Sequence, residues 1–389
     1  MRRYDFIIAG GGMAGLSLAY YLNQSVLRNK SILIIDKAEK KTNDRTWCFW
    51  ERGERNPFEA IVYRKWQVVD FYEPTFSAQL HLGDYWYKMI RGIDFYTFVL
   101  TDLLQNPNIE FVAQTIHRIT NTPQGAFVIA GDEATTYIAD YVFDSTYTLK
   151  LTDPHRHNLL QHFKGWEIET DQPVFDVNRA TLMDFRVFQD NDSRFFYILP
   201  LSPTRALVEY TLFSDKLLPP EAYVDQLTHY LQHTIGLTGY TILHEEFGVI
   251  PMTDEPTPER VGKRIIRIGT AGGYTKASTG YTFVRTQRFT QEIVGNLLTI
   301  GKPLKKRSLF RRRHRLYDSI LLNVLANHRY PGSEVFAQLF RRNEPAQVLA
   351  FLDEDTTFQE ELKIMSTVPL GQFTVAALDV FRKRVLSLI

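Results

Sequence analysis

Residues 4–36 read YDFIIAGGGMAGLSLAYYLNQSVLRNKSILIID, and this stretch decides the fold. The apolar run over 4–9 predicts a buried parallel strand, and apolar positions on one helical face predict a helix after the glycine-rich turn. A second apolar run over 31–35 predicts the next strand, which ends at Asp36. The order of strand, turn, helix, strand and acid is typical of the Rossmann unit that binds a dinucleotide, in which the acid binds a ribose hydroxyl.

The turn matches the pattern G-x-G-x-x-G through Gly10, Gly12 and Gly15. We expect Gly10 to permit the tight turn, Gly12 to let a phosphate approach the backbone, and Gly15 to let the helix pack closely on the strand. The first N–H groups of the helix, at Met13 and Ala14, would face the pyrophosphate. A glycine-rich turn without a ligand is the alternative interpretation.

A second glycine cluster lies far downstream. Residues 264–273 read RIIRIGTAGG, which predicts a strand and a flexible turn, and apolar periodicity over 281–298 predicts a helix. Such a junction suits the ribityl and pyrophosphate groups of a flavin, whereas the N-terminal unit alone leaves NAD(P) and FAD open. The two clusters together favour FAD, and these residues are its predicted contacts: Gly10, Gly12, Met13, Ala14, Gly15, Asp36, Lys37, Arg45, Gly269, Gly272, Gly273 and Thr279.

The composition narrows the class of protein. The 389 residues include 45 basic and 44 acidic ones, a balance that argues against nucleic-acid binding. The single cysteine, Cys48, excludes an intramolecular disulfide and a cysteine zinc cluster, and it fits a reducing cytoplasmic compartment. We expect neither a signal peptide nor a membrane-spanning helix, because an apolar stretch of about 18 residues does not occur.

The rest of the chain predicts a substrate lobe inserted into the nucleotide domain. Alternating patterns after about residue 155 indicate antiparallel strands, including a hairpin of 195–199 and 205–213. We therefore predict an α/β protein of the two-domain flavin-monooxygenase type, with a Rossmann-type FAD-binding domain, an antiparallel-sheet substrate lobe and a C-terminal helical region. The predicted bounds are 1–150 with 248–302 for the first, 151–247 for the second and 303–389 for the third.

Short segments along nearly the whole chain carry a family resemblance. They are DRTWCFW at 44–50, QHFKGW at 161–166, LMDFR at 182–186, YILPL at 197–201, ALVEYT at 206–211, EFGVIPM at 246–252, IGTAGG at 268–273 and TKASTGYTF at 275–283. Taken together they resemble the flavin-dependent lycopene cyclases of carotenoid synthesis. One position departs from related flavoproteins, which often place a glycine soon after the acid equivalent to Asp144. Here Ser145, Thr146 and Tyr147 follow.

The resemblance implies a redox-neutral cyclisation of the linear ends of lycopene to β-ionone rings. An acid protonates a terminal alkene, a tertiary carbocation forms, the ring closes and a proton leaves. The resemblance further implies that reduced FAD stabilises the cation and that NAD(P)H serves only to reduce the flavin. The acid must stay protonated near neutral pH, which burial in an apolar pocket favours.

Glu209 is the predicted proton donor, in the block where this family has its acidic motif. Alternation along the strand 205–213 places Glu209 on one face with Leu207 and Thr211, an environment that raises a carboxyl pKa. A solvated strand glutamate, or one paired with Arg186, is the alternative.

Asp184 is the second predicted catalytic acid, on a face shared with Leu182, and a structural pair with Arg186 is its alternative. Glu246 would position the flavin or hold a loop. We expect Trp47, like Arg45, to line the cavity near the cofactor, and Cys48 to be a core residue rather than a nucleophile.

Two further signals concern metals and membranes. His155, His157 and His162 lie close in sequence, but they lack a second cluster, so we expect no metal site. The basic stretch 302–315 is either a solvated helix face or a contact with anionic lipid. Because lycopene is insoluble and comes from a bilayer, we expect a cytoplasmic protein attached peripherally to the inner face of the membrane.

Two other functions remain open. One is an FAD-dependent monooxygenase or a prenyl-chain or carotenoid reductase that consumes NAD(P)H, and the other is a non-catalytic carotenoid-binding protein. Cyclisation leaves the mass of lycopene unchanged, hydroxylation adds oxygen and reduction adds hydrogen. The sequence leaves open whether one or both ends are cyclised and whether the ring is of the β or ε type.

Overall fold

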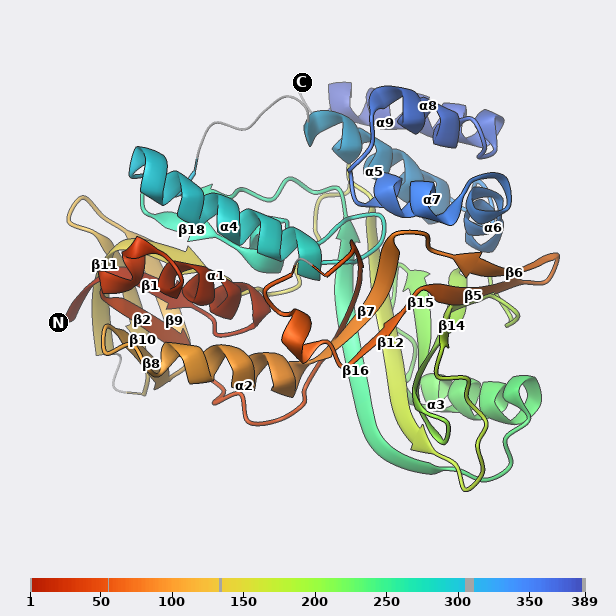
Figure 1. Ribbon diagram of the computed structural model, residues 1–389. Helices are drawn as coiled ribbons and strands as arrows, with labels where there is room; N and C mark the ends of the chain where they lie inside the picture. Colours follow the sequence, from red (N-terminus) through yellow and green to blue (C-terminus); the bar gives the residue numbers. More distant parts are fainter. Residues whose placement is uncertain (1, 55, 133–134, 305–310, 387–389) are drawn as a thin grey trace.

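The computed structural model describes residues 2–54, 56–132, 135–304 and 311–386. Over these ranges the chain forms one lobe around a parallel sheet, a second lobe around an antiparallel sheet, and helices that lie against the second lobe (Figure 1). This arrangement confirms the predicted α/β architecture with a C-terminal helical region.

The first lobe is built on the predicted Rossmann-type sheet. Its strands are β1 (Arg2–Ala9), β2 (Ile32–Asp36), β8 (Ile109–Ala113), β9 (Ile116–Asn121), β10 (Ala126–Ala130), β11 (Thr135–Asp144), β17 (Arg260–Val261) and β18 (Ile265–Arg267). β1 lies between β2 and β11, and β8 and β18 extend the parallel part on either side. β9, β10 and β17 add antiparallel pairings. β1 and β2 are almost fully buried, as their continuous apolar runs predict.

Three helices pack together on this lobe. They are α1 (Met13–Asn23), α2 (Gly92–Leu103) and α4 (Phe283–Ile300), and α1 contacts both of the others (Figure 1). The helix predicted after the glycine turn is therefore confirmed, and the one predicted over 281–298 lies two residues further along. Short helical turns are η1 (Val26–Asn29), η2 (Glu59–Ile61) and η4 (Gly269–Gly272).

The second lobe is built on the antiparallel sheet. Its strands, in spatial order, are β16 (Thr241–Thr253), β12 (Asn158–Glu169), β15 (Arg205–Ser214), β14 (Ser193–Ser202), β13 (Arg179–Asp184), β5 (Val68–Glu73) and β6 (Phe76–His81). The predicted hairpin is confirmed as β14 and β15. Helix α3 (Pro220–His229) and the adjoining π-helix η3 (Tyr230–Ile235) cover one face, and the C-terminal helices pack on the other.

The sheets divide the chain differently from the predicted domain bounds. β5 and β6 fall within the segment 1–150, yet they extend the antiparallel sheet because β5 pairs in parallel with β13. β16 runs through the predicted boundary at 247. A small third sheet of β3 (Thr46–Arg52), β7 (Tyr85–Arg91) and β4 (Arg64–Trp66) connects the two lobes, and β7 is visible between them in Figure 1.

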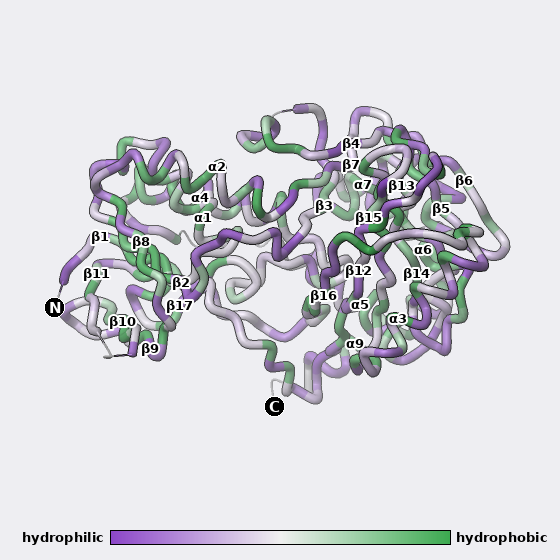
Figure 2. The backbone as a smooth tube through the Cα atoms, turned by 90° about the horizontal axis from the view of Figure 1, so that it is seen from below, coloured by the Kyte–Doolittle hydropathy of each residue, from purple (hydrophilic) through white to green (hydrophobic). Residues whose placement is uncertain are grey.

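The C-terminal region is helical where the structure describes it. Its helices are α5 (Arg311–Ala326), α6 (Gly332–Arg342), α7 (Pro345–Leu352), α8 (Phe358–Met365) and α9 (Leu370–Leu386). Among the described residues no single helix has the length and apolarity to span a membrane, although the bent pair α8 and α9 passes that test jointly. In Figure 2 the most hydrophobic backbone of the first lobe gathers in the strands of its sheet, as expected for a buried core.

Candidate functional site

A cavity of about 720 Å³ lies where the carboxyl ends of the parallel strands face the antiparallel sheet. Gly10 after β1, Asp36 at the end of β2 and Ser145 after β11 line one side. β12, β15 and β16 contribute the opposite wall, including Gln161 and Glu209. The crevice outside the carboxyl ends of such strands is where α/β sheets bind their ligands. The cavity therefore joins the nucleotide-binding edge to the second lobe.

The first glycine cluster has the geometry that its sequence predicts. Gly10 has φ of +98°, a conformation that favours glycine. A Cβ on Gly15 would overlap the carbonyl oxygen of Gly10, so α1 lies as close to the turn as glycine permits. A Cβ on Gly12 would meet no atom within 4 Å, and Gly12, Met13 and Ala14 face the cavity. Gly15 lies behind the wall and acts through packing.

Asp36 lies on the cavity wall and is held in place by backbone donors. Its carboxylate accepts hydrogen bonds from the N–H of Gly11 at 2.6 Å and of Ala38 at 2.8 Å. Lys40 Nζ lies 3.3 Å from the same side chain. Lys37, Lys40 and Arg45 line this part of the cavity. These cations suit the negative charge of a bound pyrophosphate.

The second glycine cluster approaches the start of α1. Gly269 lines the cavity, and a Cβ there would lie 2.7 Å from the Cβ of Ala14. Gly272 and Gly273 shape the turn behind it and are not among the residues that line the cavity, so their contact with the cofactor stays a prediction. Thr279 lines the cavity, and its buried hydroxyl has no hydrogen-bond partner among the described residues. That hydroxyl is available to a ligand.

Ser145 occupies the position where related flavoproteins often have glycine. Its hydroxyl donates to the carbonyl oxygens of Ala9 at 2.9 Å and Gly10 at 3.0 Å. The side chain is thus turned back onto β1 and the glycine turn. Thr146 and Tyr147 also line the cavity, so this segment forms part of the cavity wall although it contains no glycine.

Two carboxyl groups meet on the antiparallel side of the cavity. In the strand register, Glu209 of β15 and Glu246 of β16 lie on either side of Gly165 in β12. A Cβ on Gly165 would lie 3.0 Å from Glu246 Cγ, so the missing side chain leaves room for the two carboxyls to face one another across β12. Thr211 Oγ1 donates to Glu209 Oε1 at 2.7 Å. The predicted face of Glu209, shared with Leu207 and Thr211, is confirmed.

Both acids of this pair have raised pKa values. Burial, followed by the neighbouring Glu246 charge, raises the pKa of Glu209 to about 8, against the opposing hydrogen bond from Thr211. Burial also raises the pKa of Glu246, although Thr46 and Arg45 oppose the shift. Two adjacent carboxyls in a low-dielectric site resist double ionisation. The pair therefore retains a proton near neutral pH.

The sequence profile described as "Lycopene cyclase protein" matches residues 5–379, nearly the whole chain. The chain belongs to the lycopene cyclase family.

Individual family members are distant relatives. Lycopene β-cyclases of a Paracoccus strain and of Pantoea ananas are 27% and 28% identical over 64% of the chain. These matches span only 61% and 63% of the two cyclases' own lengths. The lycopene β-cyclase of Pseudescherichia vulneris is 24% identical over 98% of both chains.

Solved structures of other proteins have a fold similar to that of this chain. A geranylgeranyl bacteriochlorophyll reductase-like protein from Thermoplasma acidophilum has a TM-score of 0.63 at 12% identity, covering 98% of this chain and 100% of its own. The halogenase PltM, in complex with phloroglucinol and FAD, has a TM-score of 0.61 at 13% identity, covering 90% and 82%. At these identities the likeness concerns the fold, and it confirms the predicted flavoprotein architecture.

Aromatic side chains surround the carboxyl pair of this cyclase-family chain. Tyr87, Tyr197 and Tyr281 line the cavity, and the hydroxyl oxygens of Tyr87 and Tyr281 are 3.2 Å apart. Tyr197 lies directly opposite Glu209 in the register of β14 and β15. The sequence did not predict these tyrosines as site residues, because the register that places Tyr197 opposite Glu209 is set by the pairing of β14 with β15.

Trp47 and Cys48 border the cavity beside these aromatic groups. Trp47 thus has its predicted position. Burial raises the pKa of the Cys48 thiol far above its usual value, so the thiol stays protonated, as expected of a packing residue rather than a nucleophile.

Asp184 does not lie in the cavity of this family member. Its carboxylate binds Arg186 at 2.6 Å and accepts a hydrogen bond from Tyr230 at 2.7 Å. A register shift between Thr181 and Asp184 breaks the strand alternation, so the expected shared face with Leu182 is wrong. Asp184 forms the structural Asp–Arg pair, and its predicted catalytic position is corrected.

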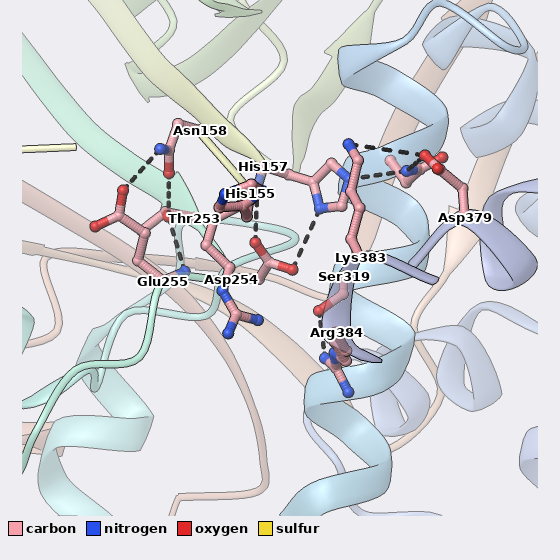
Figure 3. Close-up of polar contacts among 12 residues, drawn as sticks. His155, His157, Asn158, Thr253, Asp254, Glu255, Ser319, Asp379, Lys383 and Arg384 are labelled. Atoms are coloured by element: carbon pink, nitrogen blue, oxygen red, sulfur yellow. Dashed lines mark hydrogen bonds and ion pairs between the residues drawn. The ribbon is translucent and has the colours of Figure 1, made fainter. Parts of the chain in front are cut away.

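The histidines make polar contacts within the protein. His157 Nδ1 lies 3.2 Å from Asp254, and Asn323 of α5 lies 2.8 Å from Nε2, at a junction with the C-terminal helices (Figure 3). His162 contacts Ser214 and Tyr223, and burial lowers its pKa to about 4. Within the described residues, groups of three or more His, Cys, Asp or Glu side chains suited to a metal ion are not found. His157 and His162 are buried, whereas His155 is exposed.

Proposed function

We propose that this protein is a lycopene β-cyclase, an FAD-dependent isomerase that closes the linear ends of lycopene to β-ionone rings without net redox change. The observation that carries the proposal is a pair of carboxyl groups with raised pKa values beside aromatic side chains, in a cavity continuous with a dinucleotide-type site. The family and the relatives named lycopene β-cyclase support it.

The cavity residues fit FAD. The open space at Gly12, the N–H groups that begin α1 and the unpartnered hydroxyl of Thr279 would hold its phosphates and ribityl oxygens. Asp36 would bind the adenosine ribose. When bound and reduced, the flavin supplies an electron-rich group near the cation, and NAD(P)H is the proposed reductant.

Glu209 would supply the proton. Its carboxyl group points into a cavity lined by Leu199 and Leu207, where an apolar polyene end fits. The O–H bond breaks, a C–H bond forms at the terminal alkene, and the faces of Tyr197 and Tyr281 stabilise the tertiary cation that results. Attack by the neighbouring alkene closes the ring, and loss of a proton completes the reaction.

Expression in lycopene-accumulating cells tests this function. The wild type should turn red cells yellow-orange and give products with the mass of lycopene. Glu209→Gln should leave the cells red, with product formation reduced by roughly 100-fold or more, because proton transfer by a positioned acid contributes that much. Glu245→Gln, at the neighbouring exposed position paired with Lys164, is the matched control and should behave as the wild type. Products heavier by oxygen or hydrogen would instead identify a monooxygenase or a reductase.

We also propose that the protein is cytoplasmic and contacts the inner face of the membrane, from which its substrate comes. Part of the basic stretch 302–315 lies outside the described residues, and its Arg313 pairs with Glu361. Stronger support comes from large apolar side chains exposed on the adjacent helices α8 and α9, with exposed basic residues Lys363 and Arg382 beside them. The apolar side chains are Phe358, Leu362, Leu370, Val375, Leu378 and Phe381.

Sedimentation with vesicles of anionic phospholipid tests the membrane contact. The wild type should co-sediment, and Leu378→Ser with Phe381→Ser should reduce the bound fraction several-fold, because both side chains are about two-thirds exposed. Leu104→Ser, at an equally exposed leucine of the first lobe, is the control. Equal binding of all three proteins, or binding of none, would contradict this surface.

A further inference from the structure

Glu246 has a hydrogen-bonding arrangement that the proton-donor role of Glu209 alone does not require. The two acids come from strands that are not neighbours, because β12 separates β15 from β16. Gly165 of β12 lies between the two acids, because it pairs with Glu209 on one side and with Glu246 on the other. A Cβ on Gly165 would lie 3.0 Å from Glu246 Cγ and 3.2 Å from Leu207 Cδ1. Any larger residue would therefore fill the space through which the carboxyls meet.

Two buried carboxyl groups that lie this close together on either side of Gly165 repel one another strongly when both are charged, so the pair favours holding one proton. A carboxylate is only an acceptor, so that one proton is also what would let the two groups hydrogen-bond. Thr211 donates to Glu209 and Thr46 bonds Glu246, which fixes each acid from outside the pair.

We propose that Glu209 and Glu246 act as one unit that shares a single proton across Gly165, with Glu246 and Gly165 as positioning residues for the donor Glu209. The inference rests on the proposed function and deepens it. When Glu209 gives its proton to the alkene, both carboxyls become charged side by side. That repulsion favours return of the proton when the ring carbon loses one. The C–H bond then breaks, an O–H bond forms again, and the cycle needs no oxidant or external base.

The charged and titratable groups facing the pair come from each surrounding element. The positive charge of Arg45 lowers the pKa of Glu246, and the negative charge of Glu167 raises it. Cys48 lies close enough to interact electrostatically with both acids. Tyr197 and Tyr281 face Glu209 from β14 and the loop before α4. Arg45 is the cation among these groups, and it faces the Glu246 side, so the second carboxyl is the natural place for the charge of the singly protonated pair.

The pH dependence of cyclisation by the flavin-loaded protein tests this unit. In Glu246→Gln the neighbouring negative charge is gone, so Glu209 should lose its proton at lower pH. The alkaline fall of activity should move down by about one pH unit, which is about a tenfold loss near the wild-type midpoint. Gly165→Ala should shift it in the same direction, because the methyl group separates the acids. Glu245→Gln should keep the wild-type profile, and unchanged profiles in both pair variants would overturn the proposal.

Infrared difference spectra give a readout that does not depend on turnover. The carbonyl band of a protonated carboxyl, missing in Glu209→Gln, should titrate at higher pH in the wild type than in Glu246→Gln. If the band shifts while lycopene stays linear, the proton-sharing unit stands and the cyclase function fails. If lycopene is cyclised while neither band nor profile shifts, the cyclase stands and the unit fails.

Discussion

Two buried sites in this molecule shift the pKa values of their glutamates in opposite directions. At the cavity, Glu209 and Glu246 face one another, and both pKa values are raised. At the contact between the first lobe and the C-terminal helices, Lys276 Nζ binds Asp318 at 2.6 Å and Glu354 at 3.2 Å. Burial alone would raise the pKa of Glu354, but the nearby cations, Lys276 first among them, lower it to about 2. The neighbours therefore decide whether a buried acid keeps its proton.

The first prediction removes the cation from the contact with the helices. Lys276→Met leaves Asp318 and Glu354 buried with less compensation, although Arg285 still binds Glu354 at 2.6 Å and His314 lies 4.0 Å from it. The free energy of unfolding should fall by about 3–5 kcal/mol, as for other broken buried ion pairs. Urea unfolding of the purified protein measures it. Lys30→Met breaks an exposed pair with Asp5 and should change stability by less than about 1 kcal/mol. Equal losses of stability in Lys276→Met and Lys30→Met would show that the buried ion pairs contribute no more than the exposed one.

The second prediction removes an acid from the cavity. The folded-state pKa of Glu209 is raised to about 8 from 4.5, so above pH 4.5 the unfolded chain ionises while the native pair resists. The native state is thus destabilised progressively between those values. Glu209→Gln should abolish cyclisation yet raise the free energy of unfolding at pH 8 by up to about 4 kcal/mol, with little effect near pH 4.5.

Unfolding curves at the two pH values measure this difference. Glu354→Gln should instead lower the free energy of unfolding at both pH values, because its lowered pKa stabilises the native state above about pH 4 and this gain is lost only toward pH 2. A loss of stability in Glu209→Gln at pH 8 would contradict the raised pKa.

The smallest effect concerns the residue beside the pair. Glu245 precedes Glu246 on β16, but its side chain is half exposed and pairs with Lys164. Glu245→Gln should change the free energy of unfolding by less than about 1 kcal/mol at any pH, since exposed ion pairs contribute little. Thermal unfolding at pH 5 and pH 8 tests this. A change in the unfolding temperature of Glu245→Gln that depends on pH would show that exposed acids, like the buried ones, have shifted pKa values.

The sequence predicts local geometry well. The positions of Gly10, Gly12 and Asp36 follow from one continuous segment, whose steric demands are the same in any such turn. The face of Glu209 follows from strand alternation, because residues 206–213 pair without a break with both neighbouring strands. Both features depend on residues close together in the chain.

Features that depend on distant pairing are not predicted. Asp184 is misplaced because a register shift within β13 interrupts the alternation. The meeting of Glu209 and Glu246 depends on how β12 pairs with both neighbours, and periodicity carries no information about that register. The transfer of β5 and β6 to the antiparallel sheet has the same origin, since the parallel pairing with β13 joins segments about a hundred residues apart.

The chain holds a natural reporter of what fills its cavity. Cys48 is its single cysteine and borders the cavity between the dinucleotide-type edge and the tyrosines. A thiol reagent can therefore attach at only one cysteine, and because the buried thiol stays protonated, the reaction should be slow at neutral pH and faster at alkaline pH. A bound flavin or polyene should slow it further. The rate of labelling would then report how much of the cavity is occupied by cofactor or substrate, and the measurement needs no mutation of the protein.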